Sequence, residues 1–312
     1  MRVILTGYSG FIGSHVGAAL RQELREVELL GVSRCGSPVP GEGFAVVRVN
    51  LVADPESLRA TLRGFRPDAI VNCAGTLESG VTEAVRAHVM SAANLLRVLA
   101  EEMPGVRLIH IGSSAEYAQA VAPPESIAED ATPFPDGPYG VSKLAATQLV
   151  MTFGGDAGLR CTVLRLFNVI GRRLPESTLI GRVLAHARSA ASSAPIELGP
   201  LGMHRDFVDA RDVGAAVAAA LRCPESAGHV VNIGSGEATC VRDLVRLVLD
   251  ACGCEAPILE AGKGSQRSPH VIWQKADIRK AAAVLGWQPR LSLSETAHDL
   301  ALGIGVDSGN RR

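Results

Sequence analysis

The sequence predicts an α/β fold in which a doubly wound parallel sheet is joined to a smaller, mixed carboxy-terminal unit. Short runs rich in β-branched residues alternate with helical patterns through the first half of the chain. Three glycines at three-residue spacing follow the first of these runs, and the regular alternation loosens after Asn168. Because strands that alternate with helices form parallel sheets covered on both faces, the first half of the chain predicts the sheet.

Strands are expected in the first half at residues 3–7, 28–34, 44–50, 69–75, 107–114 and 161–169. The first helix follows the first strand, with Val16, Leu20 and Leu24 on one stripe, and the next clear helices are at 83–102 and 139–153. Later segments predict helices at 171–190 and 239–253 and a strand at 228–236. We therefore expect a first domain at 1–167, to which 206–235 return, and a second domain made of 168–205 and 236–312.

Composition and charge exclude several classes of protein. The 312 residues are 47% hydrophobic and 20% charged with a formal net charge of -1, as in a globular protein with a sizeable core. Without a basic excess or a long apolar segment, we expect neither nucleic acid nor a membrane as a partner. The seven cysteines and eight histidines show no metal-ligand spacing, so no metal is expected. Met1 leads directly into a strand, which favours a cytoplasmic location.

The glycines Gly7, Gly10 and Gly13 lie where the first strand joins the first helix. Bare backbone can turn tightly there and let a phosphate approach the amide groups at the positive end of the helix. Such a triplet can also mark an ordinary turn, but its position ahead of further alternating strands favours a dinucleotide site. The first domain is then of the Rossmann type, with a pyrophosphate as its expected ligand.

The end of the second strand bears on the choice of cofactor. An acidic residue there bonds the ribose hydroxyls of NAD, whereas an arginine accommodates the 2'-phosphate of NADP. Ser33 and Arg34 occupy this place and no acidic residue does, so NADP(H) is favoured and NAD(H) is possible. A surface arginine without a ligand is the alternative interpretation of Arg34.

Tyr139 and Lys143 are four residues apart on a predicted helix, so their side chains project from the same face. A phenol is a poor acid or base at neutral pH unless its anion is stabilised. A lysine ammonium about 6 Å away would stabilise that anion by roughly 3 kcal/mol at an effective dielectric near 20. Ser114 follows a predicted strand at the sheet edge where ligands bind, which raises the significance of the pair.

These motifs and the segments between them resemble the extended short-chain dehydrogenase/reductase family, whose members are epimerases, dehydratases and reductases of nucleotide sugars. The resemblance spans nearly the whole chain, from TGYSGFIG to LGWQP. It implies that Tyr139 exchanges a proton with a sugar oxygen, Lys143 holds the nicotinamide ribose and Ser114 bonds the same sugar oxygen. It also implies a homodimer and further cofactor contacts from Ser9, Phe11, Ile12, Asn50, Leu51, Ala74 and Gly75.

On the substrate side, the resemblance implies that Asn168, Arg205 and Arg267 bind the nucleotide sugar, with the arginines at the diphosphate. Arginines on exposed loops are the plain alternative. His88 stands where many members of the family have asparagine, and it can be a passive packing residue. Glu116 matches the glutamate of a dehydratase run, although Ala115 departs from that run.

The leading hypothesis is an NAD(P)-dependent oxidoreductase that reduces a 4-keto group, or epimerises C4, of a nucleoside-diphosphate sugar by hydride transfer. One alternative is a 4,6- or 5,6-dehydratase that uses Glu116 in addition to Ser114, Tyr139 and Lys143. The other is a non-catalytic NADP(H)-sensing regulatory protein. The nucleotide, the sugar and the stereochemical outcome are not predicted.

Overall fold

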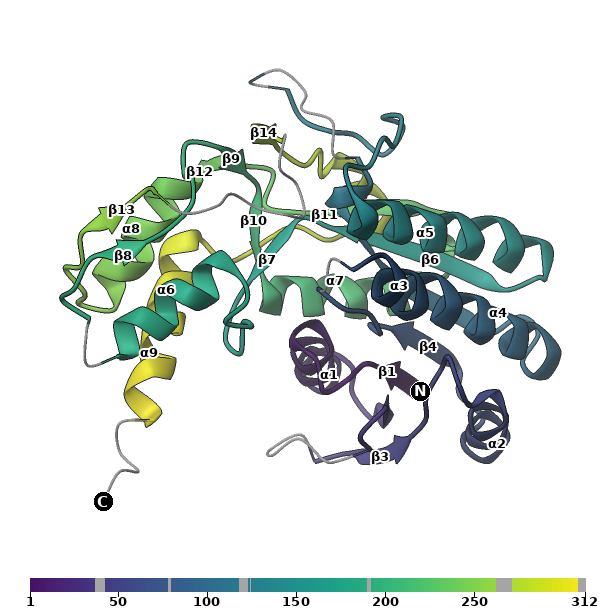
Figure 1. Ribbon diagram of the computed structural model, residues 1–312. Helices are drawn as coiled ribbons and strands as arrows, with labels where there is room; N and C mark the ends of the chain where they lie inside the picture. Colours follow the sequence, from purple (N-terminus) through teal and green to yellow (C-terminus); the bar gives the residue numbers. More distant parts are fainter. Residues whose placement is uncertain are drawn as a thin grey trace.

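A computed structural model describes residues 1–36, 43–77, 80–117, 123, 125–189, 192–261 and 271–307 of the chain, the last four as backbone only. Figure 1 shows a large sheet with helices against both faces and a smaller unit, containing α6, α8 and α9, beside the end of the sheet. The fold class predicted from the sequence is confirmed.

Among the described residues, seven parallel strands form the large sheet in the order β11-β6-β5-β4-β1-β2-β3. Their bounds are β1 (Arg2–Thr6), β2 (Glu28–Ser33), β3 (Ala45–Arg48), β4 (Ala69–Asn72), β5 (Arg107–Ser113), β6 (Arg160–Leu166) and β11 (Val230–Ile233). The direction of winding reverses between β1 and β4. Ligands of open α/β sheets bind at such a reversal, outside the carboxyl ends of the strands.

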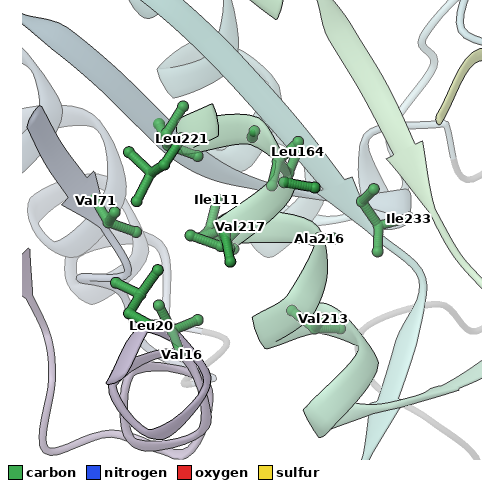
Figure 2. Packing of buried hydrophobic residues seen from close by; sticks show 14 of the residues in the cluster. Val16, Leu20, Val71, Ile111, Leu164, Val213, Ala216, Val217, Leu221 and Ile233 are labelled. Carbon is green, nitrogen blue, oxygen red and sulfur yellow. The ribbon is translucent and has the colours of Figure 1, made fainter. Parts of the chain in front are cut away.

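Helices cover the two faces of this sheet, and β1 shows why. Val3 and Leu5 point into the cluster formed with α1 (Phe11–Glu23) and α7 (Ala210–Arg222). Ile4 points into the opposite cluster, with α2 (Pro55–Phe65), α4 (Ser91–Glu102) and α5 (Pro138–Asp156). Figure 2 shows Val16 and Leu20 of α1 and Val217 of α7 packed over the strands. Each aliphatic side chain buried in this way stabilises the fold by about 1.5–3 kcal/mol.

The smaller unit is built from short strands and three helices. β7 (Asn168–Ile170) pairs with β10 (Phe207–Asp209), β8 (Ile196–Glu197) pairs with β13 (Ile258–Leu259), and β9 (His204–Arg205) lies between β12 (Thr239–Cys240) and β14 (Trp273–Gln274). Its own apolar cluster lies among α6 (Leu179–Arg188), α8 (Val241–Ala251) and α9 (Leu293–Asp307). Within the part of the chain that the structure describes, the short helical turns are α3 (Val81–Ala84), η1 (Val85–Met90), η2 (Ser114–Glu116), η3 (Pro224–Ser226) and η4 (Ala281–Leu285).

Three predicted elements differ in the structure. The helix expected at 171–190 begins only at Leu179, because Thr178 caps it by accepting from the amide of Gly181, and it ends at Arg188. The strand expected at 161–169 ends at Leu166, and its last residues start β7, which pairs with β10 in a separate small sheet. The helix expected at 83–102 is divided, because α3 passes into the π-helical turn η1 before α4 begins. Over the described residues, no helix has the length and apolar character to span a bilayer, and no acidic, histidine and cysteine side chains cluster as metal ligands would.

Candidate functional site

A cavity of about 1060 Å³ lies at the carboxyl ends of the central strands and extends into the smaller unit. Its wall on the sheet side comes from the turn after β1, the loop after β4, the end of β5 and the start of α5. The opposite wall comes from β7, the start of α6, and the segments around β9 and β14. Of the residues predicted from the sequence, those that line it are Gly10, Phe11, Ile12, Gly13, Ala74, Gly75, Ser114, Tyr139, Lys143, Asn168 and Arg205.

The glycine turn brings bare backbone to one end of this cavity. Gly7 has a φ of +66°, a left-handed conformation that glycine adopts without strain. A Cβ on Gly13 would lie 2.2 Å from the carbonyl oxygen of Gly7, so the turn and the helix pack too closely for a side chain. Gly10 is the N-cap residue before α1 and provides no side-chain cap, which leaves the first amides of the helix for a ligand. Ser9 does not line the cavity.

The predicted residues at the ends of β2 and β3 lie outside the cavity. The Oδ1 atom of Asn50 accepts hydrogen bonds from the amides of Val52 and Ala53, and Leu51 is buried in the core. Ser33 accepts a bond from the amide of Gly36 at 3.1 Å, and Arg34 is exposed beside it. Sequence reasoning missed Arg48, which is also exposed and pairs in register with Ser33.

The start of α5 carries Tyr139 and Lys143 into the cavity beside the turn that holds Ser114. A Cβ on Gly140 would lie 2.4 Å from the carbonyl oxygen of Ala115, so the glycine permits the close approach of helix and turn. Lys143 is buried, and its Nζ donates to the carbonyl oxygen of Ile111 at 2.5 Å. Burial lowers the pKa of Lys143, and the carboxylate of Glu116 acts in the opposite direction.

His88 projects from the π-helical turn η1 against Tyr139. The two rings meet edge to face, with centroids 5.4 Å apart and planes at 85°. The Nδ1 atom of His88 lies 2.8 Å from the hydroxyl of Ser142, and that hydroxyl donates to the carbonyl oxygen of Tyr139. Nε2 lies 3.2 Å from both the amide nitrogen and the carbonyl oxygen of Thr76. Burial, followed by the charge of Lys143, lowers the pKa of His88 to about 3.

Glu116 has a different place from the one expected of a catalytic acid. Its side chain is fully buried and does not line the cavity. One carboxylate oxygen accepts from the amide of Ser113 at 2.8 Å and from the hydroxyl of Thr147 at 3.0 Å, and the other pairs with Arg165 at 2.6 Å. The carboxylate is therefore committed to holding the turn after β5, and the dehydratase alternative loses the acid on which it depended.

Gln274 enters the site from β14, and sequence reasoning did not identify it. Ser114 Oγ donates to Gln274 Oε1 at 3.2 Å, and Gln274 Nε2 donates to the carbonyl oxygen of Ser114 at 3.2 Å. Asn168 lies beside them, with Nδ2 at 3.0 Å from the carbonyl oxygen of Asp206. The neighbouring Ser113 also lines the cavity, and its hydroxyl accepts from the amide of Ala115.

Arg205 brings a buried positive charge to the wall of the smaller unit. Its guanidinium donates to the carbonyl oxygens of His204 and Val271, and within the described part of the chain it forms no ion pair. Burial lowers its pKa to about 10, so it stays protonated at neutral pH. A buried cation that faces a cavity favours an anionic ligand. Arg267 lies outside the described residues.

The sequence model of the NAD dependent epimerase/dehydratase family matches residues 3–234. The chain belongs to this family. It is 35% identical over 304 residues to dTDP-6-deoxy-L-talose 4-dehydrogenase (NAD(P)(+)) of Kitasatospora kifunensis, covering 96% of this chain and 94% of the relative. It is 30% identical over 309 residues to GDP-6-deoxy-D-mannose reductase of Pseudomonas aeruginosa, covering 95% and 94% of the two chains.

The solved structures include a relative of similar shape. The structure of RMD from Pseudomonas aeruginosa, complexed with NADPH, superposes with a TM-score of 0.81 at 28% identity and covers 98% of this chain and 99% of its own. The family expected from the motifs is therefore confirmed. As a member, the chain is an NAD(P)-dependent enzyme of the epimerase and reductase type.

Proposed function

We propose that this enzyme oxidises or reduces C4 of a nucleoside-diphosphate sugar, or epimerises it, with NADP(H) as the preferred cofactor. The observation that carries the proposal is that Ser114, Tyr139 and Lys143 line the same cavity as the glycine turn after β1. Relatives of this chain are named for 4-dehydrogenation and for reduction of 6-deoxy sugars carried on dTDP and GDP.

The residues around the glycine turn fit a dinucleotide. The first amides of α1 have no side-chain cap, and a Cβ at Gly7 or Gly13 would fill the space of the turn. Gly10, Phe11, Ile12 and Gly13 would hold the pyrophosphate, and Lys143 would hold the nicotinamide ribose. When bound, the nicotinamide supplies or accepts the hydride.

The side chains of this chain supply proton transfer and orientation. Tyr139 exchanges a proton with the oxygen on C4, and Ser114 hydrogen-bonds the same oxygen. Lys143 uses one of its three N–H donors on Ile111, which leaves two for the phenolic oxygen and the ribose. Asn168 and Arg205 bind the sugar and the diphosphate, where the buried guanidinium offsets the negative charge.

Two arginines support the preference for NADP(H). Arg34 follows Ser33 at the end of β2, Arg48 ends β3 and pairs in register with Ser33, and both arginines are exposed. Arginines at the ends of these two neighbouring strands suit a 2'-phosphate, and no acidic side chain is present at the end of β2 to bond ribose hydroxyls. We expect Arg34→Ala to weaken NADPH binding about tenfold and NADH binding hardly at all, measured by cofactor fluorescence.

We also propose a homodimer. Exposed apolar side chains lie on α3, η1 and α5, with Val81 63%, Met90 44% and Val141 53% exposed. Figure 1 shows α3 beside α5 on the outer face of the large sheet. Apolar side chains gathered on neighbouring helices favour burial against a second copy.

Product analysis tests the proposed reaction. We expect the purified enzyme with NADP+ or NADPH to convert at least one sugar in a panel of dTDP-6-deoxy-L-talose, GDP-6-deoxy-D-mannose and UDP-glucose. Oxidation removes two hydrogens and reduces the cofactor, whereas epimerisation leaves the mass unchanged and alters the proton couplings at C4. Loss of water with no net cofactor change, or no conversion of any sugar, would contradict the proposal.

A further inference from the structure

The side-chain amide of Gln274 forms two hydrogen bonds with Ser114, which lies 160 residues earlier in the sequence. Gln274 is 4% exposed, and both of its amide atoms lie 3.2 Å from their Ser114 partners. Both residues line the cavity. The contact joins the turn after β5 to the small sheet of the other unit, at the point where the reaction is proposed to occur.

The chemistry of the four atoms fixes the direction of both bonds. The carbonyl oxygen of Ser114 can only accept, so the amide atom that faces it is Nε2. The other amide atom, Oε1, can only accept as well, so the hydroxyl of Ser114 is the donor. Asn168 Nδ2 is 3.5 Å from the same Oε1 and supports this orientation. The proton of Ser114 therefore has one defined direction before a ligand arrives.

The two bonds have different consequences for a ligand. At 3.2 Å the bond from Ser114 Oγ to Gln274 Oε1 is longer than the usual 2.7–2.8 Å of an O–H···O bond, so it is weak. The hydroxyl can therefore leave Gln274 and donate to a sugar oxygen with little loss of hydrogen-bond energy. The bond from Nε2 goes to backbone, and it keeps the turn in place while the hydroxyl turns. In register, Gln274 pairs with Arg205, so the same small sheet holds both the buried cation and this amide.

We propose that Gln274 is a positioning residue that holds the turn of Ser114 and keeps its hydroxyl in one orientation until the oxygen on C4 replaces Gln274 Oε1 as the acceptor. This inference rests on the proposed function. Gln274 acts through Ser114, and it contributes to turnover more than to binding of the sugar.

A double-mutant cycle on kcat tests the inference, with dTDP-6-deoxy-L-talose and NADP+ as the first probe and the other panel sugars after it. Gln274→Met keeps the length of the side chain and removes both hydrogen bonds. We expect it to lower kcat about tenfold and to change KM less than about threefold. In a Ser114→Ala background, the same substitution should change kcat less than about twofold, because the hydroxyl that Gln274 orients is absent and only the bond from Nε2 to the backbone carbonyl remains to be lost.

Trp273→Phe is the matched control, since it removes the hydrogen bond from the neighbouring indole to the carbonyl oxygen of Glu125 and does not touch Ser114. It should leave kcat within about twofold of the wild-type value. The inference would be overturned if the reductions of kcat in Gln274→Met and Ser114→Ala multiplied in the double variant. A rise in KM without a fall in kcat, or an equal fall of kcat in Trp273→Phe, would also overturn it. A wild-type enzyme that converts no panel sugar would overturn the proposed function itself, and this inference with it.

Discussion

His88 contacts the ring of Tyr139 and helps to hold it in place. Its ring lies edge-on to the tyrosine, and its two nitrogens bond Ser142 on α5 and Thr76 in the loop after β4. The packing role that the sequence left open for His88 is accompanied here by hydrogen bonds at both ring nitrogens. A neutral imidazole with its proton on Nδ1 donates to Ser142 and accepts at Nε2 from the amide of Thr76, and a second proton would add a positive charge near Lys143.

This burial predicts a dependence of stability on pH. The folded pKa of about 3 lies below the ordinary value of 6.5, so the folded state binds fewer protons and loses stability as the pH falls below 6.5. For His88 the loss between about pH 7 and about pH 5 is about 2 kcal/mol. In urea unfolding, the free energy of unfolding should fall between these two pH values in both proteins, and the fall in His88→Asn should be smaller than in the wild type by this amount. The buried His110 is present in both proteins and contributes equally to each fall. Equal falls would therefore contradict the assignment of the pH dependence to His88.

Residues defined by local spacing could be predicted, and residues defined by distant contacts could not. Tyr139 and Lys143 share one helix face, so their spacing alone brought both to the cavity. Gln274 meets Ser114 across 160 residues, and no short motif contains both. Glu116 matched a motif, yet its carboxylate forms an ion pair with the buried Arg165 of the next strand, β6. The roles assigned to these side chains stay predictions.

At the scale of elements, two glycines in the turn from β1 into α1 have different roles, one in packing and one in the approach of a ligand. Gly13 is required for packing, because its Cβ would lie 2.2 Å from backbone of Gly7. At Gly10 the nearest atom to a Cβ is 3.3 Å away, so the fold can accept a methyl group there with a small shift. That methyl group would stand at the uncapped start of α1, where the pyrophosphate is proposed to bind.

Two alanine substitutions distinguish these uses. We expect Gly13→Ala to lower the free energy of unfolding by about 3 kcal/mol or more, because backbone must move. Gly10→Ala should change it by less than about 1 kcal/mol and yet weaken NADPH binding at least about tenfold. Unfolding in urea and cofactor fluorescence measure the two effects. Equal destabilisation by the two variants, or normal NADPH affinity in Gly10→Ala, would contradict this division of roles.

At the scale of the whole molecule, the cavity depends on both units. The large sheet provides the glycine turn, Ser114, Tyr139 and Lys143, and the smaller unit provides Arg205 and Gln274. The sequence predicted this order of parts because strand and helix periods are local properties. The end of the strand at Leu166 was not predicted, since the pairing of β7 with β10 joins residues 39 apart in the sequence. The domain boundaries themselves stay predictions.

The proposed dimer can be tested by light scattering after size-exclusion chromatography. We expect the mass of two chains for the wild type and of one chain for the double variant Val81→Glu/Val141→Glu, because two charges would be buried in an apolar interface. Ile272→Glu is the control, since Ile272 is 66% exposed on the smaller unit, and it should remain dimeric. A wild-type monomer, or a dimer that survives the double variant, would contradict the proposed interface.

The turnover of Tyr139→Phe shows most directly whether Tyr139 moves the proton. This substitution keeps the ring against His88 and removes only the phenolic hydroxyl, so we expect kcat to fall about 10²–10⁴-fold with NADPH affinity within about threefold of wild type. Tyr117→Phe is the matched control, because its hydroxyl bonds Asn232 and Arg165 outside the cavity, and its kcat should stay within about threefold. Unchanged kcat in Tyr139→Phe, or an equal loss in Tyr117→Phe, would contradict the central claim that Tyr139 moves the proton.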